Sequence, residues 1–237
     1  MKKIFPYLFA ILVISDILVG TANYPSLRVV TKPLILISLL VFFFMEGRRL
    51  SKNTYYGVLL ALFLSLSGDV FLLFDAKSNS FFILGLVSFL LAHITYALVF
   101  LKDRNGKPPL FLYGILLLFF GYGILLFSYL EPDLGSLTYP VLVYVIGILA
   151  MAISALWRYK KVATSSFLWV FVGALFFVAS DSFLAINMFK FRLPWSSVWV
   201  MGTYAAAQFL LVNGVLKQIN SSANLSTLSY HSSNKPS

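Results

Sequence analysis

Apolar residues dominate this chain in long runs that are broken by charged residues, Pro, Gly or Asn. A helix that crosses a membrane needs about 20 mostly apolar residues, and the chain contains eight candidate runs of this kind. Each run is apolar on all sides rather than along one stripe, as is typical of helices surrounded by lipid and by one another. The predicted spans cover residues 5–20, 33–45, 54–74, 81–100, 109–130, 138–157, 165–187 and 196–217. Because the run at 33–45 is short, we expect its helix to begin before Pro33, near Leu27.

The distribution of positive charge predicts the orientation of these spans. If the N-terminus is cytoplasmic, 13 of the 18 Lys and Arg residues lie on the cytoplasmic side. The positive-inside rule therefore favours eight spans with both termini in the cytoplasm. Residues 1–22 also resemble a signal peptide, but Asp16 inside their apolar stretch argues against cleavage. We expect an eight-helix transmembrane domain at 1–217 and a disordered cytoplasmic tail at 218–237, where Ser and Asn are frequent.

Composition excludes several classes of protein. The chain is 60% hydrophobic and 11% charged, whereas soluble domains are about half apolar and about a quarter charged. With no Cys, disulfides, thiolate catalysis and Cys-based metal sites are excluded. The net charge of +10 follows from the topology, so we expect no nucleic-acid partner. The prediction is an all-α, multi-pass integral membrane protein, of the kind found in a bacterial inner or cell membrane, with its oligomeric state undetermined.

The third and seventh predicted spans contain similar sequences around an Asp. Segments 61–73 and 173–185 both have a small residue before the Asp and Phe-Leu two positions after it. Two similar helices four spans apart run in the same direction, which is the arrangement of a parallel 4+4 repeat. Such a repeat places Asp69 and Asp181 at similar depth. Chance similarity between apolar sequences stays an equally open explanation.

Three of the eight carboxylates lie within these apolar runs, namely Asp16, Asp69 and Asp181. A charge at the bilayer centre costs at least about 2.5–3.5 kcal/mol, so these side chains are expected to face the bundle interior. Each Asp also has a purely structural interpretation, in which it accepts a hydrogen bond from a neighbouring helix. For Asp69 and Asp181, which share depth and sequence context, we favour a functional role.

Further polar residues occur at positions from which they can join these carboxylates. His93 and Tyr96 lie one turn apart in the fourth span, and Lys32 precedes Pro33 at the start of the second. Lys32 is suited to a phosphate or to pairing with Asp16, and its structural alternative is a Lys that extends to the interface. His93 has an alternative as an interior histidine. Interior hydrogen bonding is the alternative interpretation for Tyr96, Tyr144, Tyr204 and Gln208.

Several of these motifs resemble those of the YhhN/TMEM86 family of multi-spanning membrane proteins. They are Thr31-Lys32-Pro33, Ser67-Gly68-Asp69, Gly85 and Phe89 followed by His93 and Tyr96, and Ser180-Asp181 followed by Asn187. The characterised members of that family are lysoplasmalogenases. The resemblance, which extends from the first span to about Lys217, implies hydrolysis of the vinyl ether bond of a lysophospholipid to a fatty aldehyde and a glycerophospho-alcohol. It implies polar site positions at Lys32, Asp69, His93, Tyr96, Ser180 and Asp181.

This chemistry suits a pair of carboxyl groups. Vinyl ethers resist bases, but they hydrolyse when an acid protonates the β-carbon and water captures the resulting oxocarbenium ion. One protonated carboxyl and one carboxylate divide this work in the way that paired glycosidase carboxyls do, and the sequence does not say which Asp takes which role. The candidate catalytic residues are Asp69, Asp181 and His93, and the candidate substrate-binding residues are Lys32, Tyr96, Ser180, Asp16, Tyr144 and Gln208. We expect no metal and no cofactor.

Three other functions fit some of the same residues. Carboxylates and a His within the membrane also occur in proton-coupled transporters of lipids or small molecules, although the spans here are largely uninterrupted. A non-catalytic scaffold or lipid-binding protein would not require matched Asp residues. A metal-dependent hydrolase using His93, Asp69 and Asp181 is the third alternative, but no HExxH-type spacing supports it.

Overall fold

The computed structural model describes the backbone of residues 3–102 and 109–233, and the side-chain environments of this part as far as Ile219. Within these residues the chain is helical, without strands. Its eight α-helices are α1 (Phe5–Thr21), α2 (Pro25–Glu46), α3 (Lys52–Leu72), α4 (Asn79–Leu101), α5 (Phe111–Leu130), α6 (Thr138–Leu156), α7 (Thr164–Phe189) and α8 (Ser196–Ser233). Four short 3₁₀ turns, η1 (Gly47–Arg49), η2 (Asp75–Lys77), η3 (Glu131–Asp133) and η4 (Gly135–Leu137), lie in the connections.

Seven of these helices, α2 to α8, are long and apolar enough to cross a membrane. This confirms an all-α, multi-pass integral membrane protein. Helix α1 is apolar but has only 17 residues, about 26 Å at 1.5 Å per residue, against a hydrocarbon core of about 30 Å. Its role as an eighth span therefore stays a prediction.

The helix boundaries follow from local residue chemistry. Pro25 occupies the first turn of α2, where its missing N–H costs nothing because that group has no partner in a helix. Ser51 and Ser78 precede α3 and α4, and their hydroxyls accept hydrogen bonds from backbone N–H groups of the first turn. Helix α2 thus begins eight residues before Pro33, so Lys32 lies two turns inside the helix rather than at its start.

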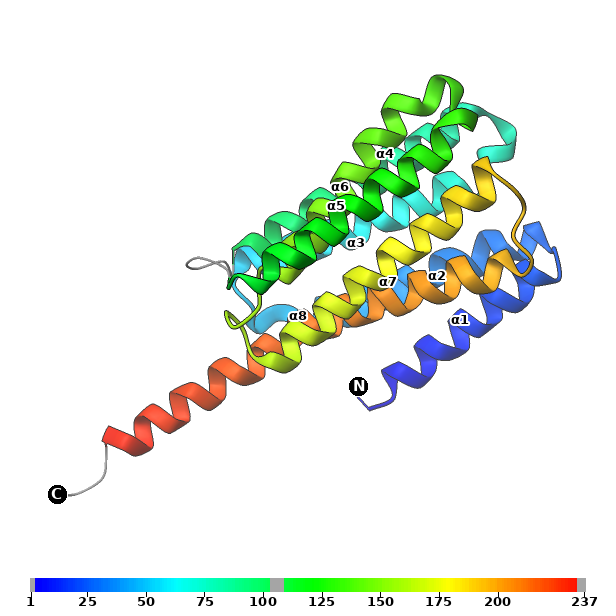
Figure 1. Ribbon diagram of the computed structural model, residues 1–237. Helices are drawn as coiled ribbons and strands as arrows, with labels where there is room; N and C mark the ends of the chain where they lie inside the picture. The colour runs from blue at the N-terminus through cyan, green and yellow to red at the C-terminus, as the bar shows by residue number, and fades with distance from the viewer. Residues whose placement is uncertain (1–2, 103–108, 234–237) are drawn as a thin grey trace.

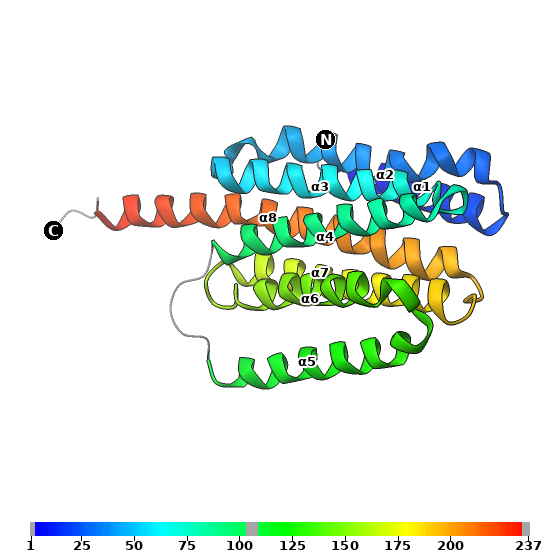
Figure 2. The same ribbon diagram turned by 90° about the horizontal axis from the view of Figure 1, so that it is seen from above.

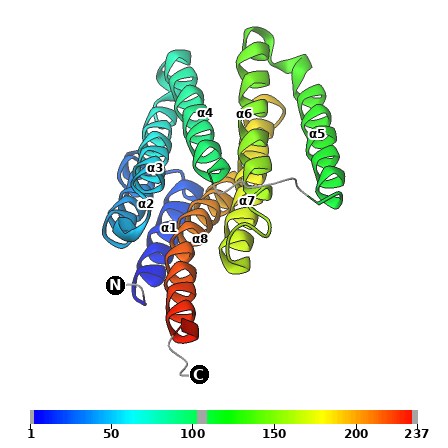
Figure 3. The same cartoon turned by 90° about the vertical axis from the view of Figure 1, so that its left-hand side faces the viewer.

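Seven helices form a closed ring (Figure 3). Its order is α1, α2, α3, α4, α6, α7 and α8, with α8 packing back against α1. Helix α5 lies outside this ring, against α6, and touches α7 only lightly (Figure 2). The odd-numbered helices run opposite to the even-numbered ones, so the connections from α1 to α2, α3 to α4 and α7 to α8 share one end of the bundle (Figure 1). We call it the η2 end.

Helix α8 continues to Ser233, beyond the predicted end of the last span at 217. Of the tail that we expect to be disordered, residues 234–237 lie outside the described part of the chain. The disordered state of 218–237 stays a prediction.

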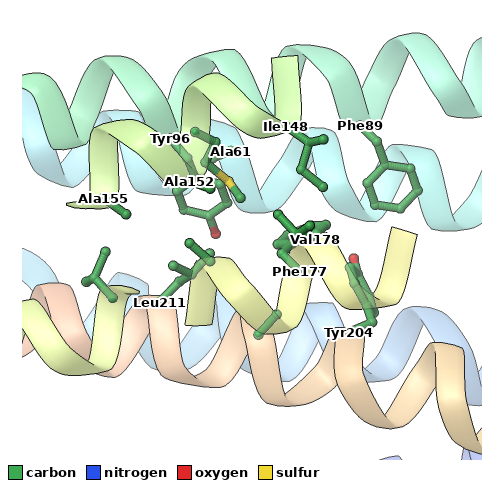
Figure 4. Packing of buried hydrophobic residues seen from close by; sticks show 14 of the residues in the cluster. Ala61, Phe89, Tyr96, Ile148, Ala152, Ala155, Phe177, Val178, Tyr204 and Leu211 are labelled. Carbon is green, nitrogen blue, oxygen red and sulfur yellow. The ribbon is translucent and has the colours of Figure 1, made fainter. Parts of the chain in front are cut away.

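The ring interior is filled by large apolar side chains with a few aromatic ones among them. Figure 4 shows Phe177 of α7 lying beside Phe89 of α4 and Tyr204 of α8, with Tyr96 further along the same space. The Phe177 ring contacts the Tyr204 ring edge-to-face at 5.5 Å, and the Phe89 ring contacts Tyr204 at 5.9 Å. Polar side chains inside the ring are therefore surrounded by hydrocarbon, where hydrogen bonds and ion pairs determine their positions.

Candidate active site

Asp69 is buried inside the ring with a partner for each carboxylate oxygen. The Lys32 ammonium on α2 lies 3.2 Å from Oδ1, and the Tyr204 hydroxyl on α8 donates to Oδ2 at 2.8 Å. Only 2% of the Asp69 side chain is exposed. A carboxylate this deeply buried needs a counter-charge to remain ionised, and Lys32 provides it. Asp69 and Lys32 form a buried ion pair.

A chain of hydrogen bonds extends from Asp69 along α8. The side-chain N–H of Gln208 donates to the Tyr204 hydroxyl at 3.5 Å, and the Tyr96 hydroxyl donates to the Gln208 side-chain carbonyl at 2.8 Å. Tyr204 and Gln208 are four residues apart, so they occupy the same face of α8. From the sequence, Tyr204 was interpreted only as an interior hydrogen-bonding residue. Its spacing of one helical turn from Gln208, a candidate site residue, is the signal that connects it to the site.

Asp181 has different surroundings. Its Oδ2 accepts a 2.6 Å hydrogen bond from the Tyr144 hydroxyl of α6, and Nε2 of His93 on α4 lies 3.6 Å from the same oxygen. Oδ1 has no hydrogen-bond partner within the described part of the chain, and 12% of the side chain is exposed. Asp181 therefore keeps an oxygen free for a further contact.

His93 is completely buried, yet neither ring nitrogen has a hydrogen-bond partner among the described residues. Its ring contacts Phe177 at 4.6 Å and Tyr144 at 5.3 Å, both edge-to-face. Buried polar atoms are nearly always satisfied by protein or water, and a buried water forms about three hydrogen bonds. His93 does not line the apolar cavity, so its nitrogens are enclosed beside Asp181 without a hydrogen bond from the described residues.

An apolar cavity adjoins Asp181. Its walls come from α3 to α7 and are almost entirely aliphatic and aromatic, and Tyr122, Tyr144, Asp181 and Ser182 supply the polar side chains. The cavity is therefore an apolar space with a carboxyl group in its wall.

The two Asp residues do not share a partner. Asp69 does not line the apolar cavity, and the Phe177 ring contacts both His93 of the Asp181 group and Tyr204 of the Asp69 group. Asp69 lies three residues before the end of α3, whereas Asp181 lies eight residues before the end of α7. The structure thus contains two adjoining polar groups, which we call the Asp181 group (Asp181, Tyr144 and His93) and the Asp69 group (Asp69, Lys32, Tyr204, Gln208 and Tyr96).

Two further sequence-predicted residues lie apart from both groups. Asp16 accepts a 2.7 Å hydrogen bond from Thr31, and its Oδ1 is 4.0 Å from Nε of Arg28. Ser180 donates to the backbone carbonyl of Val200, which connects α7 to α8. Asp16 and Ser180 therefore have structural partners, and neither lines the apolar cavity.

Among the described residues, no three His, Asp or Glu side chains come together as a set of metal ligands. The metal-dependent alternative would need His93, Asp69 and Asp181 around one ion, whereas Asp69 has both oxygens engaged by Lys32 and Tyr204.

Comparison with known proteins identifies the family. The model of the YhhN family matches residues 27–215. Lysoplasmalogenase TMEM86A of Bos taurus is 34% identical over 175 residues, which are 70% of this chain and 67% of the relative. Lysoplasmalogenase TMEM86B of Homo sapiens is 35% identical over 161 residues, 66% of this chain and 62% of the relative. The lysoplasmalogenase of Mycobacterium bovis is 33% identical over 157 residues, 65% of this chain and 58% of the relative.

No solved structure matches the chain significantly. The family model covers most of the transmembrane part, including both Asp groups and the cavity, and the curated relatives carry the same family name that the sequence motifs indicated. The chain belongs to the YhhN family of integral membrane proteins.

Proposed function

We propose that the protein is a membrane-embedded hydrolase that cleaves the vinyl ether bond of lysoplasmalogen-type lysophospholipids to a fatty aldehyde and a glycerophospho-alcohol. Curated relatives of this family from mammals and mycobacteria are named lysoplasmalogenases. The observation that carries the proposal is the position of Asp181, which lines an apolar cavity with one oxygen bonded to Tyr144 and the other free.

Asp181 is the proposed acid. No Lys or Arg among the described residues lies within 4 Å of its carboxyl group, so Asp181 lacks the counter-charge that Lys32 gives to Asp69. The proton passes from Asp181 to the β-carbon of the vinyl ether, and the electron pair of the C=C bond forms the new C–H bond. The ether oxygen then shares the positive charge as an oxocarbenium ion, and Asp181 becomes a carboxylate that stabilises it.

Water completes the reaction. A water molecule beside His93 attacks the oxocarbenium carbon and gives a proton to the imidazole or to Asp181, which forms a hemiacetal. The hemiacetal C–O bond to the glycerol breaks as the proton taken from water is given to that oxygen, while the hemiacetal hydroxyl gives its own proton to Asp181, so aldehyde and alcohol leave and Asp181 is protonated again. General acid–base assistance of this kind contributes about 10²–10⁴-fold in rate. His93, with two unbonded nitrogens, fits this role.

We propose that the Asp69 group, which adjoins the Asp181 group across the Phe177 ring, has a supporting role in the site. Since Lys32 holds Asp69 as an ion pair, we assign Asp69 to the ionised member of the carboxyl pair, with Tyr204, Gln208 and Tyr96 fixing its orientation. The Phe177 ring separates this group from the Asp181 group, with contacts to Tyr204 on one side and to His93 on the other. Tyr144 is proposed to orient Asp181 through their 2.6 Å hydrogen bond.

We also propose that α1 completes an eight-span bundle with both termini in the cytoplasm of a bacterial-type cell. The bias of Lys and Arg towards one side of the predicted spans supports this topology. A 4+4 repeat gains support from the packing of α3 against α4 and of α7 against α8, which are the most extensive helix pairs in the bundle.

The function is tested by incubating purified protein with a lysoplasmalogen and, separately, with the ester-linked lysophospholipid of the same chain and head group. The proposal predicts fatty aldehyde from the vinyl ether and no fatty acid from the ester. Absence of aldehyde from a folded, membrane-inserted preparation, or release of fatty acid from the ester at a similar rate, contradicts it.

A further inference from the structure

A second, polar pocket adjoins the apolar cavity at the η2 end of the bundle. Its polar lining includes Arg28, Lys32, Asp75 and Asn187. Four residues line both spaces, namely Leu72, Phe82, Leu184 and Met188. A molecule with a hydrocarbon chain and a polar end can therefore occupy the two spaces together.

Arg28 is the cation of this pocket that is available for a ligand. Lys32 is paired with Asp69 at 3.2 Å, whereas Arg28 is paired more loosely with Asp16, with Nε 4.0 Å from Oδ1. Oδ1 of Asp16 already accepts a hydrogen bond from Thr31, and Nε of Arg28 makes none within the described residues. With 30% of its side chain exposed, the guanidinium presents donors that fit the oxygens of a phosphate.

Asp75 adds the opposite charge to the same pocket. Its Oδ1 accepts a hydrogen bond from the backbone N–H of Ala76, and no Lys or Arg among the described residues lies within 4 Å of its carboxylate. Asp75 and Phe82 also line a neighbouring hollow, where Phe189 packs edge-to-face on the Phe82 ring at 5.8 Å. A carboxylate beside aromatic rings is the environment that binds organic ammonium groups.

A ligand with charge of one sign would satisfy only one of these two groups. A purely anionic phosphate would pair with Arg28 but would be repelled by Asp75, and a cation would meet the reverse situation. A ligand that carries both a phosphate and an ammonium group pairs with both, and it leaves no charged side chain desolvated without a partner.

We propose that this polar pocket binds the zwitterionic head group of a lysophospholipid, with the phosphate at Arg28 and the ammonium group at Asp75. The inference rests on the proposed function, because the chain of the same lipid then extends into the cavity beside Asp181. Asp75 is the residue that selects zwitterionic head groups over anionic ones.

Binding of non-hydrolysable lipids tests the head-group site independently of catalysis. The ligands are saturated 1-O-alkyl lysolipids of one chain length that carry phosphoethanolamine, phosphocholine, phosphoglycerol or phosphate alone, titrated into detergent-solubilised full-length protein by calorimetry. We expect the two zwitterionic lipids to bind about tenfold more tightly than the two anionic ones. Phosphoethanolamine without a chain, and inorganic phosphate, should compete only weakly, which separates a lipid site from a site for free phosphate.

Single substitutions distinguish the two charges. Asp75→Asn should remove the preference for zwitterionic lipids. Arg28→Lys, which keeps a cation beside Asp16 but loses the planar fork of donors, should weaken all the phosphate-bearing lipids to a similar degree. Lys77→Gln is the matched control, since Lys77 lies two residues from Asp75 over the Phe74 ring and outside the polar pocket, and it should preserve the preference.

Equal binding of zwitterionic and anionic lipids by the unsubstituted protein, an unchanged preference in Asp75→Asn, or strong competition by inorganic phosphate overturns the inference. Failure of the proposed function looks different. In that case the alkyl lipids bind with the expected preference, but no aldehyde is released from the corresponding vinyl ether.

Discussion

The Tyr144 hydroxyl on α6 donates a 2.6 Å hydrogen bond to Oδ2 of Asp181 on α7. This contact directs one carboxyl oxygen into the protein and leaves the other beside the apolar cavity. It also brings Tyr144 into edge-to-face contact with His93, so three helices hold the proposed acid. The predictions below concern this group, the Asp69 group and the cavity.

Tyr144→Phe should lower kcat while the protein remains folded. The substitution removes the hydrogen bond that orients Asp181 and that strengthens as Asp181 loses its proton, and a hydrogen bond to a charged group is worth about 1.5–3 kcal/mol. We therefore expect about a 10- to 100-fold decrease in aldehyde release under saturating substrate. Tyr139→Phe is the matched control, because Tyr139 is on the same helix and 79% exposed. A Tyr144→Phe enzyme as fast as this control would remove Tyr144 from the mechanism.

His93→Leu should separate stability from activity. Because neither imidazole nitrogen has a hydrogen-bond partner among the described residues, the substitution leaves no protein group unsatisfied, and we expect little loss of thermal stability. Turnover should fall by about 10²–10⁴-fold, the usual contribution of an acid–base group. Thermal unfolding in detergent and steady-state kinetics on the same preparation measure both quantities. A large fall in unfolding temperature with normal turnover would indicate a structural His93.

The effects of substituting Lys32 and Asp69 on thermal stability should depend on each other. Lys32→Met alone leaves a buried carboxylate without its counter-charge, which costs about 3–5 kcal/mol, and Asp69→Asn alone leaves a buried ammonium. The double variant Lys32→Met, Asp69→Asn removes both charges and should recover much of the unfolding temperature without recovering activity. Double-mutant analysis of thermal unfolding gives the coupling energy, and additive losses would show that the two groups are not a pair.

Ala185→Phe should make the enzyme selective for short chains. Ala185 lines the apolar cavity, so a phenyl ring there occupies space that we assign to the substrate chain. We expect KM to rise about tenfold or more for a long-chain lysoplasmalogen, since each buried CH₂ contributes about 0.8 kcal/mol, and to change little for a short-chain one. Ala150→Phe, on an exposed position of α6 outside the cavity, should leave both values unchanged. An equal rise in KM for the long-chain and the short-chain substrate would show that the substrate chain binds elsewhere.

The sequence predicted the helices more completely than their packing. Apolar runs broken by charged residues, Pro and Gly identified the helices, since a spanning segment must satisfy its backbone internally. Hydropathy could not predict that α5 lies outside the ring while α6 closes it. Both helices are apolar on all sides, and only the shapes of their contacts distinguish them.

The same limit applies to the site. That buried Asp residues face the interior follows from the cost of charge in hydrocarbon, and Asp69 and Asp181 do lie inside the ring. The partner of each carboxylate does not follow from sequence. Lys32 was considered for a phosphate or for Asp16, but ring closure places it against Asp69 and gives Asp16 to Arg28 and Thr31. The only sequence signal that Arg28 lies near the site is its position one helical turn before Lys32.

The most direct test of the account is the rate of aldehyde release from a lysoplasmalogen by the Asp181→Asn variant, in protein that is folded and that still binds a 1-O-alkyl lysolipid. Asparagine preserves the shape of the side chain and can accept the Tyr144 hydrogen bond, but it has no carboxyl proton to give to carbon. The account predicts normal lipid binding and no detectable aldehyde. Aldehyde release at the rate of the unsubstituted protein would contradict it.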